Sequence, residues 1–306
     1  MINALVTGGG GYKGTLLVKR LLELRHKVTL LDNFMYGFDS VLHLAREEHL
    51  QILSLDVRNI QARDLKCFDI VFHLAGISGY PACEANPHSA EKINVEATQR
   101  LANCLSTGQV LVYASTTSFY GCVPSACDET SRVQPVSTYG ITKYEAEKIC
   151  QERKNSISLR FATLFGVSPK MRVDLLVNDF VYKAVNERSI VLFDARSSRT
   201  FLHVSDAISA YILALNNVER MCGQVYNVGD DRLNFTKQQI AEAIREHVNF
   251  EIVNSRLPDM DVRDFKVSFD KIKSLGFSVN HSLDDGIREL LKLYHFYKPH
   301  LNYRVI

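Results

Sequence analysis

The chain of 306 residues lacks most of the features that point to a nucleic-acid-binding or membrane protein. Its 36 lysines and arginines nearly balance its 34 aspartates and glutamates, and a formal charge of +2 argues against a nucleic-acid surface or a polybasic membrane patch. No apolar run is long enough for a membrane span, and the N-terminal segment has the pattern of a folding strand and turn instead of a signal peptide. We therefore expect neither nucleic acid nor a membrane among its partners.

The sequence also lacks the spacings of disulfide, zinc and redox motifs. Its seven cysteines include no C-x-x-C pair, and its ten histidines include no H-x-x-x-H pattern. An odd, scattered set of thiols is typical of a cytoplasmic enzyme with reduced cysteines, and no metal site is expected. Cys83 lies near the expected active-site loop, but a free cysteine most often packs in a core.

No linker, internal repeat or low-complexity segment divides the chain. A length of 306 residues suits one large domain with a smaller lobe. The strand and helix patterns become less regular after residue 167. We expect a cofactor-binding domain over 1–167 and a mainly substrate-binding lobe over 168–306, with a soft boundary and some later segments returning to the large domain.

The first stretch with a clear chemical meaning is Ile2–Leu16. A short apolar strand precedes Gly8, Gly11 and Gly14, and a helical pattern follows over 12–25. Glycines in such a turn let the backbone approach a phosphate, and the start of the helix offers free N–H groups to the anion. A glycine triplet alone is weak evidence, because glycines also occur in ordinary turns.

The context of this turn favours a dinucleotide. A second apolar strand ends at Asp32, 18 residues after Gly14. A carboxylate there can accept both ribose hydroxyls of an adenosine and would repel a 2′-phosphate, which favours NAD over NADP. The alternative for Asp32 is a helix cap or turn residue. Asp56, at the end of the third strand, could accept the adenine amine or cap the next helix with equal plausibility.

Strands and helices alternate along the first half of the chain. This order predicts an α/β fold, a doubly wound parallel sheet with helices on both faces, and a smaller mixed α/β lobe at the C-terminal end. The expected strands are 27–31, 50–55, 69–74, 109–114 and 156–161, followed by 190–193, 200–203 and 224–228. The expected helices are 60–66, 81–105, 137–152, 175–186, 206–216, 236–247 and 283–294, with a loop and helix over 33–48.

Three residues in the middle of the chain form a candidate catalytic group. Thr116 lies in the hydroxyl-rich end of a strand, and Tyr139 and Lys143 share one face of an expected helix start. A phenol becomes a useful base when neighbouring positive charge favours its anion, and Lys143 would supply that charge. A Y-x-x-x-K pair alone is more often an exposed helix face. It becomes informative here because a dinucleotide fingerprint and a hydroxyl-rich strand end precede it.

These residues together resemble the extended short-chain dehydrogenase/reductase family, in particular its NAD-dependent nucleotide-sugar epimerases and dehydratases. The resemblance covers nearly the whole chain and is more specific for the family than for the reaction. The motifs that carry it are TGGGGYKG (7–14), HLAG (73–76), INVEAT (93–98), YASTTSFYG (113–121), YGITK (139–143), SLRFATLFG (158–166), SPKMRVDLLVNDF (168–180), RTFLHVSD (199–206) and VRDFKVSFDKIKSLGF (262–277).

The resemblance implies a Rossmann-type domain, an NAD cofactor, a nucleotide-diphospho-sugar substrate and a homodimer. Helices 81–105 and 137–152 would pair in that dimer, although core packing explains their apolar stripes equally well. It implies catalytic roles for Thr116, Tyr139 and Lys143, and substrate contacts from Thr116, Asn178 in a turn, and the diphosphate-clamping Arg199 and Arg263. The implied cofactor-binding residues are Gly8, Gly11, Tyr12, Lys13, Gly14, Asp32, Asn33, Asp56, Val57, Leu74, Ala75, Gly76, Tyr139 and Lys143.

Departures from the family pattern narrow the reaction. Thr117 and Ser118 stand where 4,6-dehydratases have Asp-Glu, so the carboxyl groups for water loss are missing. Ser118 also replaces the cysteine that a 3,5-epimerase would need. The interpretation is hydride transfer at C4, either as C4 epimerisation or as a 4-dehydrogenase with a 4-keto product; a non-catalytic NAD-binding regulator is a weaker alternative. The nucleotide base and the sugar cannot be read from spacing.

Two residues, Lys13 and His203, also allow a structural interpretation. Lys13 stands where the family usually has an apolar residue before the last glycine, and its stem could be buried while the ammonium reaches the pyrophosphate or solvent. His203, just before an expected helix, is interpreted as structural.

Overall fold

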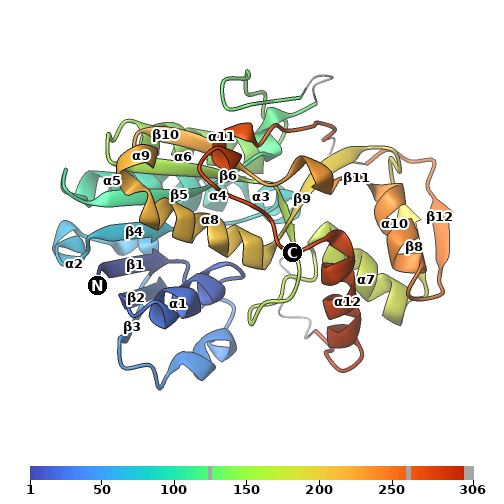
Figure 1. The fold of residues 1–306 in the computed structure, drawn as a ribbon, viewed down its shortest axis with the longest axis horizontal. Helices are drawn as coiled ribbons and strands as arrows, with labels where there is room; N and C mark the ends of the chain where they lie inside the picture. Colours follow the sequence, from blue (N-terminus) through green and yellow to red (C-terminus); the bar gives the residue numbers. More distant parts are fainter. Residues whose placement is uncertain (123–125, 260–262, 300–306) are drawn as a thin grey trace.

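The computed structural model of the protein describes residues 1–122, 126–259 and 263–299. Its centre is a seven-stranded sheet in the order β10-β6-β5-β4-β1-β2-β3, with all neighbouring strands parallel (Figure 1). The chain begins in the middle of this sheet and winds outward first on one side and then on the other, which confirms the expected doubly wound α/β fold. The strands are β1 (Asn3–Thr7), β2 (Lys27–Asp32), β3 (Leu50–Ser54), β4 (Ile70–His73), β5 (Val110–Thr116), β6 (Ser156–Phe161) and β10 (Gln224–Val228).

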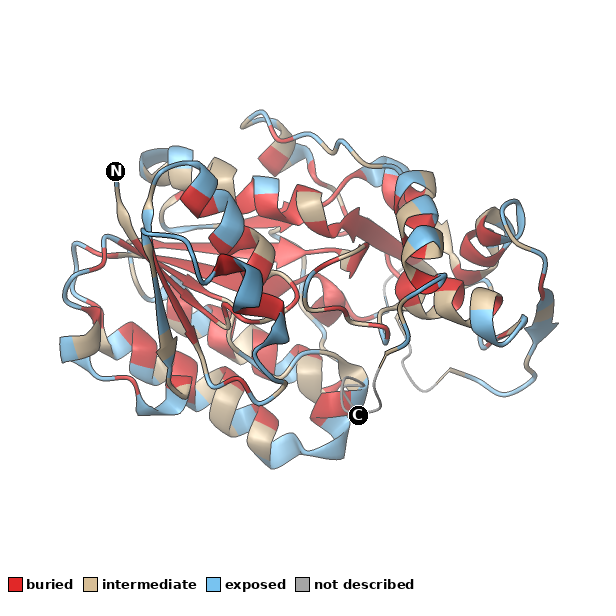
Figure 2. Ribbon diagram, turned by 90° about the horizontal axis from the view of Figure 1, so that it is seen from below, coloured by how far each residue is buried: buried red, intermediate tan, exposed pale blue. Residues whose placement is uncertain are grey.

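Helices cover both faces of the sheet and create a separate apolar core on each. Helices α1 (Gly14–Glu23) and α8 (Val204–Asn216) pack with one set of strand side chains. Helices α5 (Ala97–Cys104) and α6 (Thr138–Gln151) pack with the alternate set on the other face. Figure 2 shows the buried strands between helices whose outer sides are exposed. Because the strands are buried on both faces, they read as continuous apolar runs in the sequence.

A smaller lobe lies at one end of the sheet (right side of Figure 1) and has its own apolar core. It contains a two-stranded parallel pair, while a three-stranded sheet in the order β11-β9-β7 connects the two regions. The helices of the lobe are α7 (Leu176–Asn186), α10 (Lys237–Arg245) and α12 (Leu283–Tyr294). The strands are β7 (Thr163–Phe165), β8 (Ser189–Leu192), β9 (Ser198–His203), β11 (Asn234–Thr236) and β12 (Glu251–Asn254).

The expectation of one long helix over 81–105 is wrong. The helix is interrupted once, because Asn86 leaves the helical region (φ −146°, ψ 78°) immediately before Pro87, and residues 87–104 then continue as contiguous helical segments. A residue before proline is disfavoured in the α conformation, and proline is favoured at the first position of a new helix. The Asn86 side chain accepts a hydrogen bond from the Ser89 N–H and so caps that new helix. The segments are α3 (Tyr80–Ala85), α4 (Pro87–Ala90), a π-helical turn η3 (Glu91–Glu96) and α5.

Other differences involve short elements whose sequence signal is weak. The expected helix after Asp32 is a 3₁₀ segment, η1 (Asp39–Leu44), and the expected helix 60–66 shortens to α2 (Ala62–Leu65). Strands β7, β11 and β12 were not expected. The remaining short segments are η2 (Val57–Asn59), η4 (Ser118–Tyr120), α9 (Val218–Met221), η5 (Asp231–Leu233) and α11 (Asp270–Lys273). No helix in the described part of the chain is long and apolar enough to cross a membrane.

Candidate active site and cofactor cleft

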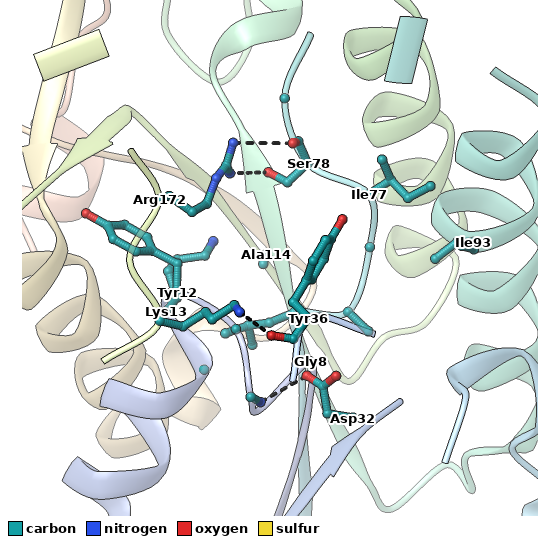
Figure 3. Close-up of a pocket in the computed structure, with 18 of the residues that line it drawn as sticks. Gly8, Tyr12, Lys13, Asp32, Tyr36, Ile77, Ser78, Ile93, Ala114 and Arg172 are labelled. Atoms are coloured by element: carbon teal, nitrogen blue, oxygen red, sulfur yellow. Dashed lines mark hydrogen bonds between the residues drawn. The ribbon is translucent and has the colours of Figure 1, made fainter. Parts of the chain in front are cut away.

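A cavity of about 310 Å³ lies at the carboxyl ends of the parallel strands. Its walls come from the loops after β1, β2, β3, β4, β5 and β6, from α6, and from the segment before α7 (Figure 3). Its lining includes Asp32 at the end of β2 and Thr116 at the end of β5, which are three strand positions apart in the sheet. At the usual strand spacing this separation is about 14 Å. The cavity thus extends over several strand ends, as a dinucleotide site in this type of fold does.

The glycine loop is packed too tightly for side chains. Gly8 has a positive φ of 69°, and a Cβ there would lie 2.7 Å from the backbone nitrogen of Ala75. A Cβ on Gly14 would lie 2.2 Å from the carbonyl oxygen of Gly8. No side chain caps the start of α1, although the Thr15 N–H donates to the Gly11 carbonyl at 3.1 Å, and an uncapped helix start is where a pyrophosphate binds. The donor set of the loop therefore fits an NAD cofactor.

Asp32 faces this loop from the end of β2. Its Oδ2 accepts a hydrogen bond from the Gly10 N–H at 3.0 Å, and its Oδ1 accepts one from the Phe34 N–H at 2.9 Å (Figure 3). Burial raises the pKa of the Asp32 carboxyl, while these hydrogen bonds and the charge of Lys170 oppose that effect. Asp32 thus holds the loop in place, as the turn interpretation predicted. Each of its oxygens can still accept a second hydrogen bond from a ribose hydroxyl.

Asp56 is occupied by neighbouring protein groups. It accepts a hydrogen bond from the Arg58 N–H at 2.9 Å and so caps η2. Its two oxygens also accept from the Arg58 guanidinium at 2.9 and 2.8 Å, and Asn33 donates to it at 3.2 Å. The Arg58 side chain holds the pKa of the Asp56 carboxyl well below its usual range. The structure therefore shows the capping role, and the contact with adenine stays a prediction.

Tyr139 and Lys143 line the other end of the cavity from the first turns of α6. The side chain of Ser137 accepts a hydrogen bond from the Gly140 N–H at 3.1 Å, which fixes where this helix begins. The Lys143 ammonium lies 4.2 Å from the centre of the Tyr113 ring. Burial lowers the pKa of Lys143 to about 8. Tyr139 and Lys143 thus both line the cavity from one helix, and their catalytic pairing stays a prediction.

Thr116, the last residue of β5, lines the same end of the cavity. Its hydroxyl donates to the Ser118 Oγ at 3.0 Å and accepts from the Ser118 N–H at 3.1 Å. Arg263 donates to the same Ser118 Oγ at 2.6 Å. A guanidinium thus lies beside the hydroxyl pair, and the diphosphate contact expected of Arg263 stays a prediction.

A buried ion pair anchors α6 against the sheet behind these residues. The Glu147 carboxylate accepts hydrogen bonds from Arg160 on β6, the shortest at 2.7 Å, and from the Ser115 hydroxyl on β5 at 2.6 Å. Arg160 also donates to the Tyr120 hydroxyl at 2.7 Å. Glu147 lies one turn beyond Lys143, so this network fixes the helix that carries the candidate catalytic pair.

Arg172 is a lining residue that the sequence analysis did not single out. It donates to the Ser78 hydroxyl at 3.2 Å and to the Ser78 carbonyl at 3.4 Å, and it pairs with Asp174 (Figure 3). The charge of Asp174 raises the pKa of Arg172 against the effect of burial. Arg172 therefore joins the segment before α7 to the loop after β4. Its signal in the sequence was present only as part of the 168–180 motif.

The Lys13 side chain extends into the cavity and not out to solvent. Its Nζ lies 4.2 Å from the centre of the Phe161 ring and 5.8 Å from that of Tyr211. Burial, together with the charges of Lys143 and Arg172, lowers the pKa of Lys13 well below its ordinary value. The sequence predicted that the Lys13 ammonium reaches the pyrophosphate or solvent. Its contacts with the Phe161 and Tyr211 rings were not predicted.

Comparison with known proteins places the chain in a family. The model of the NAD dependent epimerase/dehydratase family matches residues 4–229. The chain belongs to this family. It is an NAD-dependent enzyme, as the motifs predicted.

Individual members of the family and solved structures agree with this assignment. The chain is 30% identical over 248 residues to "Uncharacterized UDP-glucose epimerase YtcB" of Bacillus subtilis (strain 168), covering 74% of this chain and 76% of that protein. It is 25% identical to a UDP-N-acetyl-alpha-D-glucosaminuronate decarboxylase of Bacillus cytotoxicus, covering 94% and 96%. The crystal structure of the UDP-glucuronic acid 4-epimerase from Bacillus cereus has the same fold, with a TM-score of 0.84, 23% identity, and coverage of 96% and 99%.

Two of the expected substrate residues of this family member have other roles in the structure. Asn178 lies inside α7 and not in a turn, and it is fully buried. It accepts from the Gly166 N–H at 2.9 Å and donates to the Arg172 carbonyl at 2.9 Å, so it holds the segment that carries Arg172. Arg199 is buried on β9 and pairs with Asp259 at 3.7 Å. Neither Asn178 nor Arg199 is among the described residues that line the cavity, and their contacts with the substrate stay predictions.

A group of metal-ligand side chains lies outside the cavity. The ligand atoms of His203, Asp206 and His281 lie within 4.8 Å of one another. The two imidazole rings are stacked, 4.2 Å apart with an angle of 21° between them, so their in-plane lone pairs do not converge. Asp206 accepts from the Asn280 and His281 N–H groups at 3.1 Å, and His203 Nε2 contacts Glu289 at 2.7 Å. These contacts tie the loop before α12 to α8, and they give His203 the structural role predicted from sequence.

Proposed function

We propose that this enzyme catalyses C4 epimerisation of a nucleotide-diphospho-sugar. The observation that carries the proposal is that Thr116, Tyr139 and Lys143 line one cavity together, where the described lining residues offer phenols, amines and guanidinium groups near Thr116. Among the described lining residues the carboxylates are Asp32 and Asp56, both at the adenosine end. A site of this composition can move a proton to and from a sugar hydroxyl, but it lacks the carboxyl groups that would assist loss of water.

In the proposed reaction Tyr139 accepts the proton of the C4 hydroxyl. Bound NAD⁺ supplies the hydride acceptor for the C4 hydrogen. The Lys143 ammonium favours the phenolate of Tyr139 and can hold ribose hydroxyls, while Thr116 donates or accepts a hydrogen bond at the reacting oxygen. Tyr139 then returns the proton after the hydride has been delivered to the opposite face of the 4-keto sugar. The epimer results when the sugar turns its other face to the cofactor between the two transfers.

The charges at this end of the cavity also suit an anionic substrate. Lys13, Lys143, Arg172 and Arg263 line it, and guanidinium groups pair well with phosphate or carboxylate oxygens. The diphosphate of a sugar nucleotide and the carboxylate of a uronic sugar are such groups. The names of related proteins, which include a UDP-glucose epimerase, a UDP-glucuronic acid 4-epimerase and a UDP-sugar acid decarboxylase, support a UDP-sugar as the first choice.

A panel of nucleotide sugars with purified protein tests the proposal. UDP-, GDP-, dTDP- and CDP-hexoses and UDP-glucuronate are incubated separately, and products are identified by NMR. We expect one substrate to yield its C4 epimer, with no net accumulation of NADH. Stoichiometric NADH together with a 4-keto sugar would instead identify a 4-dehydrogenase, and loss of CO₂ a decarboxylase. No turnover of any sugar together with retained NAD binding would favour a non-catalytic role.

A further inference from the structure

The loop that binds the pyrophosphate carries an unusual positive charge into the reactive end of the cavity. Lys13 immediately precedes α1, and its stem crosses toward β6, where Nζ lies over Phe161. Phe161 pairs in register with Thr116 of the neighbouring strand. The ammonium is therefore near the strand ends that hold the candidate catalytic group and not near Asp32. Figure 3 shows Lys13 among the side chains of this pocket.

The position of the nicotinamide follows from the two ends of the cavity. Asp32 marks the adenosine end, the glycine loop marks the pyrophosphate, and the hydride acceptor must lie beside Tyr139. Lys13 belongs to the glycine loop, and its ammonium reaches Phe161 beside Thr116, so a cofactor bound in this direction would have the Lys13 charge between its pyrophosphate and its nicotinamide. Lys143 and Arg172 are near enough to affect its titration.

We propose that the Lys13 ammonium makes the protein discriminate between the two redox states of its cofactor, weakening the binding of NAD⁺ relative to NADH. The proposal deepens the proposed function, because an epimerase must retain NADH until the hydride is returned. The hydride that leaves the sugar carbon carries two electrons to the ring, and the hydroxyl proton goes to Tyr139. This transfer removes the positive charge of the nicotinamide ring. The Lys13 ammonium would therefore repel the ring of NAD⁺ but not that of NADH.

The surroundings of Lys13 explain why this charge acts strongly. Lys13 is half-buried, and its ammonium lies beside the packed rings of Phe161 and Tyr211, where electrostatic interactions are less screened than in solvent. The aromatic faces stabilise a cation, and the negative pyrophosphate at the same loop favours the ammonium over the neutral amine. These two effects oppose the lowering of the pKa of Lys13 by burial and by the charges of Lys143 and Arg172, so a bound cofactor favours the charged form of Lys13.

The test measures the affinities of NADH and NAD⁺ for cofactor-free protein, without any sugar. NADH binding is followed by the fluorescence of NADH itself, and the chain has no tryptophan whose emission would overlap with its excitation. NAD⁺ binding is measured by competition with NADH. In Lys13→Met we expect the ratio of the NAD⁺ to the NADH dissociation constant to fall about tenfold, as loss of one repulsive charge in a partly desolvated site predicts. Lys13→Ile, with the family's usual kind of residue, should give the same result.

Two variants separate this charge effect from other causes. Lys13→Arg keeps the charge and should keep the ratio close to that of the unmodified protein. Lys19→Met removes a charge from the exposed side of the same helix and should leave the ratio unchanged. An unchanged ratio in both Lys13→Met and Lys13→Ile, or an equal fall in Lys19→Met, would overturn the proposal. The measurement needs no turnover, so a failed epimerase assay would not affect it.

Discussion

The two ends of the cofactor cavity use charge in opposite ways. At the adenosine end the lining carboxylates Asp32 and Asp56 are held by backbone N–H groups and by Arg58, and the lining cation Lys170 lies close enough to act on Asp32. At the reactive end the lining charges are the cations Lys13, Lys143, Arg172 and Arg263. The first arrangement suits neutral ribose hydroxyls and repels an extra phosphate. The second suits anions and a phenolate. We therefore expect one part of this continuous cavity to select the cofactor and propose the other part for the chemistry.

The largest effect is expected from removing the base at the reactive end. Tyr139→Phe should lower turnover by at least about two orders of magnitude, because general acid–base catalysis contributes that much or more. NAD binding should persist, since the glycine loop and Asp32 are unchanged. Turnover of the preferred nucleotide sugar and the cofactor content of the purified variant are the two measurements. Full activity would remove Tyr139 from the mechanism.

The next largest effect is on the pH dependence of the free energy of unfolding, because Lys143 is buried in the folded protein. Its pKa falls from 10.5 to about 8 in the folded protein, so between these values the unfolded chain binds more protons than the folded one. The free energy of unfolding should therefore rise with pH over this window, by up to about 3 kcal/mol from this group. The rise is measured by urea unfolding at several pH values as the difference between the unmodified protein and Lys143→Met. An identical pH dependence in the two proteins would show that Lys143 keeps its ordinary pKa.

At the adenosine end Asp32→Asn should reduce the preference for NAD over NADP by about tenfold or more, since a charged acceptor and a repulsive charge are both lost. The amide oxygen can still accept one of the two backbone hydrogen bonds, so the loop should remain folded. Competition of NAD and NADP against fluorescent NADH measures the change. A preference that stays constant would mean that Asp32 acts only within the loop.

The smallest effect is expected from Asp56→Asn, which serves as the matched comparison for Asp32. Asp56 is committed to Arg58 and Asn33 at the surface, and such pairs contribute about 1 kcal/mol or less. We expect less than about a threefold change in NAD affinity by the same competition assay. A loss as large as that of Asp32→Asn would show that Asp56 contacts the adenine after all.

Much of the large domain and of the reactive end could be predicted from sequence. Long apolar runs identify buried parallel strands, and the glycine spacing and the Tyr139–Lys143 pair depend on local geometry alone. The break at Asn86–Pro87 was missed because the apolar stripe continues across it, although the proline itself was a visible signal. Asn178 was expected in a turn but lies in α7, because a motif gives a residue's position along the chain but not its local backbone conformation. The positions of Lys13 and Arg172 in the cavity depend on packing between segments far apart in sequence.

The sheet order has a consequence for how the protein is made. Strand β10 lies beside β6, yet the chain between them forms much of the smaller lobe. During synthesis the ribosome therefore releases β6 long before its neighbour exists. Every residue of β6 is buried in the finished protein, so a nascent or truncated chain ending near residue 167 would expose an unpaired strand edge together with the apolar side chains of Ile157, Leu159 and Phe161. Fragments that keep all the cofactor motifs but stop before β10 should therefore aggregate, and a usable cofactor-binding fragment would have to extend through Val228.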